Sequence, residues 1–362
     1  MSMSPQGSPH FAEFRLYHST AIILCLCVAV IFGFVVYRPI ITDADRSAKR
    51  TDGDLILYQR IAEQIHSGAN YYIAAGNELR RMGYPTRSVF NWRLPTLAWI
   101  LGYMPSIRSG QFLVIVLTSI AMLIWLRVLQ QYHYGRWQMF FGGIILSGPV
   151  VYSLIPGPVL NHEFWAGTLI ALSLAAYAKG WRVVSISSGL TALFLRELSL
   201  PFVCVMMVIS FIEGKRQEAL IWFTGLLLFC GFFLYHWTTV SKLMMEQDHA
   251  MQGGWFAFGG WQFVLHTAQT HPYLLLLPTW VTIFILPLAL LGLCWRRSPL
   301  GIRVAATVGI YVLAFLIVGR PLNKYWGMVY AFVFPLGLLH APAAFKDLWR
   351  PFQKKLNAQT TS

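Results

Sequence analysis

Long apolar segments alternate with short polar connections along most of this chain. The first apolar segment covers residues 19–37 and ends at Arg38-Pro39. Segments of this kind approach the roughly 20 residues that an α-helix needs to cross about 30 Å of hydrocarbon. Their recurrence predicts an all-α, polytopic membrane protein with about ten transmembrane helices in a single membrane domain, 1–362. The other expected spans are 110–130, 137–155, 164–179, 183–196, 198–213, 217–236, 275–294, 300–318 and 324–342.

Two longer connections, 38–109 and 237–274, separate these segments. Within the first, residues 54–67 place apolar side chains on one helical face and polar side chains on the other, which predicts a helix lying in the membrane interface. The apolar face holds Leu55, Tyr58, Ile61, Ala62 and Ile65. The segment 91–104 is apolar but has only 14 residues. We therefore expect it to lie on the surface or to re-enter the membrane without spanning it.

Composition and charge fit this picture and set an orientation. Hydrophobic residues make up 56% of the chain and charged residues 12%, whereas soluble domains have about 25% charged residues. The net charge of +14 comes from Lys and Arg that collect in alternate connections, for example at Arg136, Lys215 and Arg297. Such connections stay in the cytoplasm, so the charge indicates orientation and does not indicate a nucleic-acid partner. Both termini are then expected inside, with 343–362 as a cytoplasmic tail, and the two long connections outside.

No cofactor or metal site is expected. The five cysteines all lie in apolar runs, without the spacing of a zinc site or a disulfide framework. No Walker loop, dinucleotide fingerprint, nucleophile elbow or zinc-protease helix is found.

Acidic residues of the first long connection are candidates for acid–base chemistry. Asp43, Asp45 and Asp54 follow the first apolar segment. A carboxylate held near a partly dry interface can accept the proton of a sugar hydroxyl as that hydroxyl attacks an anomeric carbon. The competing interpretation is that Asp54 caps the N-terminus of the interfacial helix, and the two roles are compatible.

The same connection carries a spaced pattern, Asp54-x-x-x-Tyr58-x-x-x-Ala62-x-x-x-x-x-Gly68-x-x-Tyr71-Tyr72. This pattern resembles the first external loop of the GT-C glycosyltransferases, which are integral membrane enzymes that take sugars from polyprenyl-phosphate carriers. The likeness is to their bacterial mannosyltransferase-like branch. It makes Asp54 the first candidate for the catalytic base and places Tyr58 at the substrate. Asp43 and Asp45 stay open as alternatives, because many GT-C enzymes place the base near the end of the first helix.

Two pairs of neighbouring residues could complete such a site. His162-Glu163 begins the fourth apolar segment, where GT-C enzymes often hold a second acidic residue. The resemblance implies that Glu163 binds sugar hydroxyls, assists His162 or holds a metal; the local alternative is that Glu163 complements the helix dipole. Arg196-Glu197 interrupts an apolar run, where charges are usually functional or paired. Arg196 is expected to face the donor phosphate with Glu197 orienting it, or the two form a structural ion pair.

The last outer connection carries a further group of polar residues. Arg320 offers a planar fork to a phosphate and Lys324 a mobile point charge. With Asn323 they favour an anion site. Tyr325 is expected to stack on a sugar or to belong to an aromatic belt. We expect Arg196, Arg320 and Lys324 to converge on one cavity around the donor phosphate.

The resemblance implies a glycosyltransferase of the bacterial inner membrane with its active site facing the periplasm. It would move a sugar from a polyprenyl-phosphate carrier to a glycan, lipid or protein acceptor, with inversion and an Asp general base. One departure leaves the sugar open: the branch commonly has Tyr-Pro-Pro where this chain has Asn91-Trp-Arg-Leu-Pro95. The alternatives are a transporter or flippase of lipid-linked saccharides and an inactive scaffold. Transporters often show two similar halves, and this chain shows no such symmetry.

Overall fold

The computed structural model describes residues 8–9, 16–36, 44–132, 134–251 and 257–360. Over these residues the protein is almost entirely helical, which confirms the predicted all-α class. The α-helices are α1 (Leu16–Val36), α2 (Ala44–His66), α3 (Tyr71–Arg81), α4 (Pro95–Tyr103), α5 (Ile107–Gln131), α6 (Arg136–Ser153), α7 (His162–Ala178), α8 (Arg182–Leu195), α9 (Leu200–Ile212), α10 (Arg216–Leu243), α11 (Gly260–Ala268), α12 (Pro272–Leu275), α13 (Thr279–Cys294), α14 (Pro299–Ile317), α15 (Met328–Ala331) and α16 (Ala341–Thr360).

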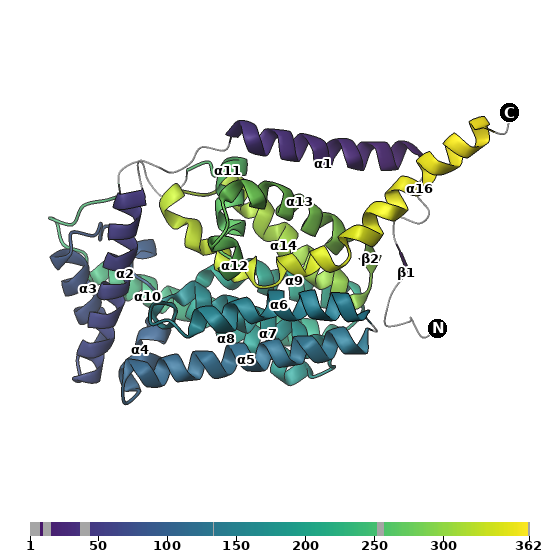
Figure 1. Ribbon diagram of the computed structural model, residues 1–362. Coiled ribbons are helices and arrows are strands. Elements are labelled where there is room, and N and C mark those ends of the chain that lie inside the picture. Colours follow the sequence, from purple (N-terminus) through teal and green to yellow (C-terminus); the bar gives the residue numbers. More distant parts are fainter. Residues whose placement is uncertain (1–7, 10–15, 37–43, 133, 252–256, 361–362) are drawn as a thin grey trace.

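Short elements connect several of these helices. The 3₁₀ turns are η2 (Val89–Asn91), η3 (Gly157–Leu160), η4 (Glu197–Ser199), η5 (Pro321–Gly327) and η6 (Phe334–Leu339). In the described part of the chain, the only strands are β1 (Ser8–Pro9) and β2 (Arg296–Arg297), which pair antiparallel. Figure 1 shows α2 and α3 at one end of the molecule, and β2 with the protruding α16 at the other.

Four helices among the described residues are long and apolar enough to cross a membrane: α1 counted from Tyr17, α5, α10 and α14. The chain thus has the helices expected of a membrane protein. Five other expected spans correspond to helices of 13 to 18 residues, namely α6, α7, α8, α9 and α13. The full set of ten spans and its orientation remain a prediction.

The expected span 324–342 does not form one helix. Its residues fall into η5, α15 and η6. Pro335 lacks a backbone donor and disfavours the helical conformation of the residue before it, and Gly327 and Gly337 are weak helix formers. Close packing then fixes the broken path. A Cβ on Gly167 of α7 would lie 2.1 Å from the carbonyl oxygen of Met328, so α15 passes directly against the α7 backbone.

Helix α7 forms the centre of the protein. Every residue from His162 to Tyr177 is buried, and α5, α8 and α15 pack around it. A helix that is apolar on all sides is typical of such a central position. Its N-terminal end points toward the α2–α3 end of the molecule, because α2 and η3 are in contact there.

The first long connection forms a packed group of helices. Helix α2 begins at Ala44, so Asp54 lies inside it and the interpretation of Asp54 as an N-cap is wrong. The predicted apolar face is confirmed as one face, but Ile61, Ala62 and Ile65 are buried against α3 and α4. That face therefore holds the helical group together and is not free to enter a membrane interface. Helix α4 has nine residues and rises only about 14 Å, so 91–104 does not span, as predicted.

The structure differs from the sequence-based expectation in two further segments. The connection expected over 237–274 is partly helical, because α10 continues to Leu243 and the buried α11 lies within it. The expected tail 343–362 belongs largely to the 20-residue helix α16.

Candidate functional site

A cavity of about 460 Å³ lies at the α2–α3 end of the molecule. Segments far apart in the sequence line it: α2, the connection 83–93, residues 249–251 and the connection 320–325. Residues proposed from the sequence that line it are Asp54, Tyr58, Arg320, Asn323 and Tyr325. The fold therefore brings candidates from the first and the last outer connections into one site.

Asp54 and Tyr58 reach the cavity from one face of α2, because residues four apart in a helix lie above one another. The hydroxyl group of Tyr84 donates a hydrogen bond to Oδ1 of Asp54. Tyr84 is positioned by the end of α3, where Gly83 adopts a φ of 70° and the Tyr84 amide donates to the Leu79 carbonyl. This arrangement is a Schellman motif. The chain reversal at Gly83 therefore directs the phenol onto the Asp54 carboxylate.

Arg93 joins the two sides of the cavity, and the sequence reasoning missed it. Its Nε donates to the Tyr58 hydroxyl oxygen at 3.0 Å, and its Nη2 to the Tyr325 hydroxyl oxygen at 2.9 Å. The Tyr71 hydroxyl donates to the Arg93 carbonyl and fixes the backbone there. The sequence did hold one signal that could have identified Arg93: it is a lone cation in the apolar stretch Trp92-Arg-Leu-Pro95.

Each of these phenols keeps its own proton. Burial raises the pKa of Tyr58 well above its ordinary value, although Arg93 opposes the shift. Since each hydroxyl oxygen already accepts from Arg93, its O–H remains a donor. Neither Tyr58 nor Tyr325 donates to any acceptor in the part of the chain that the structure describes. The cavity therefore presents two oriented hydroxyl donors.

The connection at 320–325 adds amide and guanidinium groups to the cavity. Arg320 and Asn323 both line it. The amide nitrogen of Asn323 is buried and has no partner among the described residues. A buried donor without a partner is costly unless a ligand or water satisfies it, so this amide indicates a polar ligand.

His162 lies behind Tyr58. The two rings meet edge to face at 5.0 Å between centroids, and both side chains border a small apolar space with Arg93. Burial lowers the pKa of His162 well below its ordinary value, and the charges of Arg93 and Arg196 lower it further. Both ring nitrogens lack partners in the described structure. His162 is thus a neutral imidazole that packs against Tyr58.

Arg196 is held by two protein carboxylates. Its Nε donates to Glu163 at 2.7 Å, and its Nη1 donates to Glu197. Arg196 and Glu163 are each 2% exposed, and Glu163 also occupies the first turn of α7. The structure therefore contains the ion pair that was the alternative for Arg196, extended to a triad. This triad supports the N-terminal end of α7 beside His162.

The expectation that three cations line one cavity is wrong. Arg320 lines the cavity, but Arg196 is held in the triad and Lys324 is not among the lining residues. Lys324 lies near His266 of α11, whose pKa falls to about 4 through burial and the Lys324 charge. The second cation that lines the cavity, beside Arg320, is Arg93.

The described residues include only one of the two alternative bases. Asp43 lies outside the described residues. Asp45 belongs to the first turn of α2, nine residues before Asp54, a separation of about 14 Å along a helix axis. Among the described residues, Asp54 is therefore the candidate base that lines the cavity.

An ion pair holds the segment 249–251, which forms one wall of the cavity. Arg80 of α3 donates to both carboxylate oxygens of Asp248, at 2.8 and 2.9 Å. The Thr86 and Arg87 amides donate to the His249 carbonyl at 3.1 and 3.2 Å. These bonds hold residues 249–251 at the cavity. Among the described residues, no group of His, Cys, Asp and Glu is arranged to hold a metal ion.

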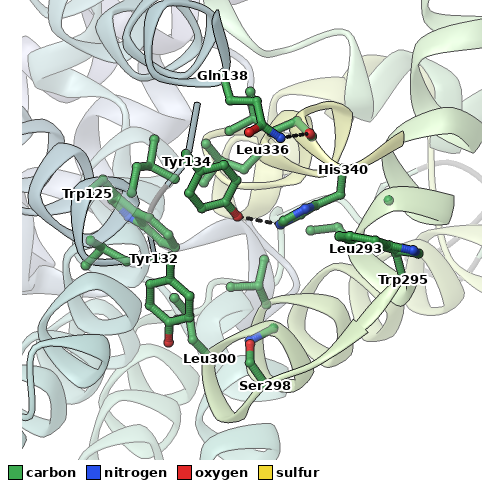
Figure 2. Close-up of a pocket in the computed structure, with 16 residues that line it drawn as sticks. Trp125, Tyr132, Tyr134, Gln138, Leu293, Trp295, Ser298, Leu300, Leu336 and His340 are labelled. Atoms are coloured by element: carbon green, nitrogen blue, oxygen red, sulfur yellow. Dashed lines mark hydrogen bonds between the residues drawn. The ribbon is translucent and has the colours of Figure 1, made fainter. Parts of the chain in front are cut away.

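A second cavity of about 280 Å³ lies at the other end of the molecule, near β2. Figure 2 shows its aromatic lining, with Tyr134 hydrogen-bonded to His340 and Gln138 to the Leu339 carbonyl. The described residues that line it include no Asp, Glu, Lys or Arg. Its lining therefore has no carboxylate that could act as a base and no Lys or Arg that could hold a phosphate.

Comparison with known proteins adds no family or activity. No protein-family model, no curated protein and no solved structure matches the chain significantly.

Proposed function

We propose that this protein is a GT-C-like glycosyltransferase that moves a sugar from a polyprenyl-phosphate carrier to a glycan, lipid or protein acceptor. The observation that carries the proposal is a single cavity lined by Asp54, Arg320 and the two phenols that Arg93 holds. A carboxylate and a cation that share a polar cavity supply a proton acceptor and a charge that stabilises a leaving phosphate.

In the proposed reaction, Asp54 and Arg320 each have one role. The acceptor hydroxyl oxygen attacks the anomeric carbon while Asp54 takes the hydroxyl proton. The bond from the anomeric carbon to the phosphate oxygen breaks, and the lipid phosphate leaves with the bonding electrons. Arg320 stabilises the negative charge that develops on that oxygen. Attack opposite to the leaving group inverts the anomeric centre.

The remaining polar groups would bind the sugar. The hydroxyl donors of Tyr58 and Tyr325 and the Asn323 amide suit sugar hydroxyl oxygens, since each has a proton to donate. His162, Glu163, Arg196 and Glu197 act as support in this proposal, because their network lies behind Tyr58. Lys324 lies at the margin of the site, where it would attract the anionic donor without contacting it.

The proposed setting is the bacterial inner membrane, with the cavity at the periplasmic face. The ten-span topology belongs to this proposal, with 324–342 as a broken segment and not as one helix. It rests on the apolar pattern, on the positive charge of the connections at the opposite end, and on the four helices that can span.

Turnover by Asp54→Asn tests the proposal. Purified protein would be reconstituted with a polyprenyl-phosphate hexose and with membranes that supply acceptors, and release of polyprenyl phosphate measured by mass spectrometry. We expect release by the wild type and a loss of about 10² to 10⁴ in rate for Asp54→Asn, with Asp45→Asn near normal. Loss in Asp45→Asn or Asp43→Asn alone would move the base to that residue. Movement of intact donor across the bilayer without release would support a flippase.

A further inference from the structure

Helix α16 has a firmly packed first half. Ala344 and Leu348 are fully buried in a cluster with Leu291 of α13 and with Ile22 and Leu26 of α1. Asp347 is also buried, and it accepts a hydrogen bond from Trp295 Nε1 at 2.8 Å. The start of α16 is therefore fixed to α13 and to the first part of α1.

The other face of α16 carries an apolar stripe whose side chains are exposed or half-buried. Phe345, Trp349, Phe352 and Leu356 follow at intervals of four, three and four residues, which places them on one side of a helix. Phe345 and Trp349 stack at 6.2 Å between centroids, and Trp349 and Phe352 at 5.2 Å. Trp349 is 44% exposed and Leu356 60% exposed. Stacking keeps the three rings together as one surface.

Positive charge borders this stripe. Lys346 and Lys355 lie on its two sides, and Arg350 and Lys354 lie farther round the helix; all four are exposed. The only acidic residue in the sequence of α16 is Asp347, which is buried and paired with Arg350 at 3.1 Å. The exposed surface of α16 therefore carries a net positive charge.

The position of α16 relates it to the membrane. Helix α1 is the most apolar candidate span and is largely unburied. Helix α16 contacts α1 near Ile22 and Leu26, in the N-terminal part of that span. In Figure 1 α16 leaves the body at this end and projects beyond the N-terminal end of α1. It thus emerges where a membrane-embedded α1 would approach the bilayer surface.

We infer that the exposed face of α16 docks on an anionic lipid surface. Its aromatic stripe would enter the boundary between head groups and acyl chains, and its cations would bind lipid phosphates. Pro351 lies between the two halves and removes the backbone donor to residue 347, so the outer half can bend toward the bilayer. A second copy of the helix fits less well, because two equally basic faces would repel each other. This inference does not depend on the proposed enzymatic activity.

An environment-sensitive fluorophore on the full-length protein tests the docking. In a background in which the five cysteines are replaced, Leu356→Cys on the stripe and Asn357→Cys beside it would each carry an NBD label. The protein would be placed in nanodiscs of phosphatidylcholine alone or with phosphatidylglycerol. We expect a blue shift and stronger emission at 356 in the phosphatidylglycerol discs, quenching by doxyl-labelled lipids, and little change at 357.

Charge removal supplies the matched control. Lys346, Lys354 and Lys355 changed together to Gln should abolish the dependence on phosphatidylglycerol. About 1 M salt, where the Debye length is about 3 Å, should weaken it in the unchanged protein. The inference is overturned if the label at 356 stays in water in both lipids, if the lysine changes have no effect, or if the shift depends on protein concentration, which would indicate a second copy as the partner.

Discussion

The guanidinium of Arg93 holds Tyr58 and Tyr325, which lie at opposite ends of the sequence. Arg93→Gln removes the charge and cannot reach both phenols, and hydrogen bonds to a charged group are each worth about 1.5–3 kcal/mol. We expect weaker binding of the lipid-phosphate sugar and a lower thermal midpoint. Arg93→Lys should recover only part of the loss, because an ammonium lacks the planar fork.

The matched control variants keep both aromatic rings and remove only the hydroxyl groups. Tyr58→Phe and Tyr325→Phe should lower donor affinity with a smaller change in thermal midpoint. Unchanged binding and stability in Arg93→Gln would show that Arg93 does not organise the site.

Asp248 offers a prediction about pH. Its hydrogen bonds from Arg80 lower the pKa of the Asp248 carboxyl well below its ordinary value. The unfolded chain therefore binds this proton more tightly than the folded chain does. The stabilisation is fully present above the unfolded pKa of about 3.9 and is lost as the pH falls through the lower folded pKa.

Thermal unfolding in detergent at several pH values checks this. At pH 7, Asp248→Asn should lower the midpoint, and the difference from the wild type should shrink below about pH 3.9. A difference that stays constant as the pH falls would contradict the role given to the ion pair. A double-mutant cycle with Arg80→Gln separates the pair from effects of either residue alone.

At the residue scale, the sequence identified the candidates that stand out by charge. Asp54 was singled out by its place in the pattern that resembles the GT-C loop, and Arg320 by its planar fork in a connection that also holds Asn323 and Lys324. Arg196 has two carboxylate partners, and the sequence could predict only one of them. Glu197 is adjacent to Arg196, whereas Glu163 lies on another helix. Arg93 carried the same signal as Arg196, but its role depends on Tyr325 being folded back onto α2.

At the scale of elements, long apolar runs predicted most of the long helices, and hydrophobic periodicity predicted the apolar face of α2. It did not predict that α3 and α4 would cover that face, since periodicity does not name the partner. Nor did it predict the broken path through η5, α15 and η6. That path depends on contacts such as Gly167 with the Met328 carbonyl, which only the assembled structure shows.

Gly167→Ala tests this packing. Its Cβ would meet backbone 2.1 Å away, and overpacking typically costs about 1–3 kcal/mol. We expect a clear fall in the thermal midpoint. Gly231 in α10 is the control, because a Cβ there meets nothing within 4 Å. Gly231→Ala should be neutral or stabilise by about 1 kcal/mol. Equal effects of the two changes would contradict the close approach of α15 to α7.

At the scale of the whole molecule, the proposed topology places the two ends on opposite sides of the membrane. Ser67 follows α2 and is exposed, and Trp181 lies in the α7–α8 turn and is 48% exposed. Single cysteines at these positions in a cysteine-free background should react with an impermeant maleimide from opposite sides of the membrane. Reaction of both from the periplasmic side of intact cells would contradict the orientation.

The central claim is that the cavity between α2 and η5 binds a polyprenyl-phosphate sugar for transfer. Native mass spectrometry of protein released from mild detergent tests it most directly. We predict a polyprenyl-phosphate adduct on the wild type and on Asp54→Asn, most of it lost in Arg320→Gln and Arg93→Gln but kept in Arg136→Gln at the opposite end. Absence of any isoprenoid phosphate, or equal retention by all these variants, would contradict the account.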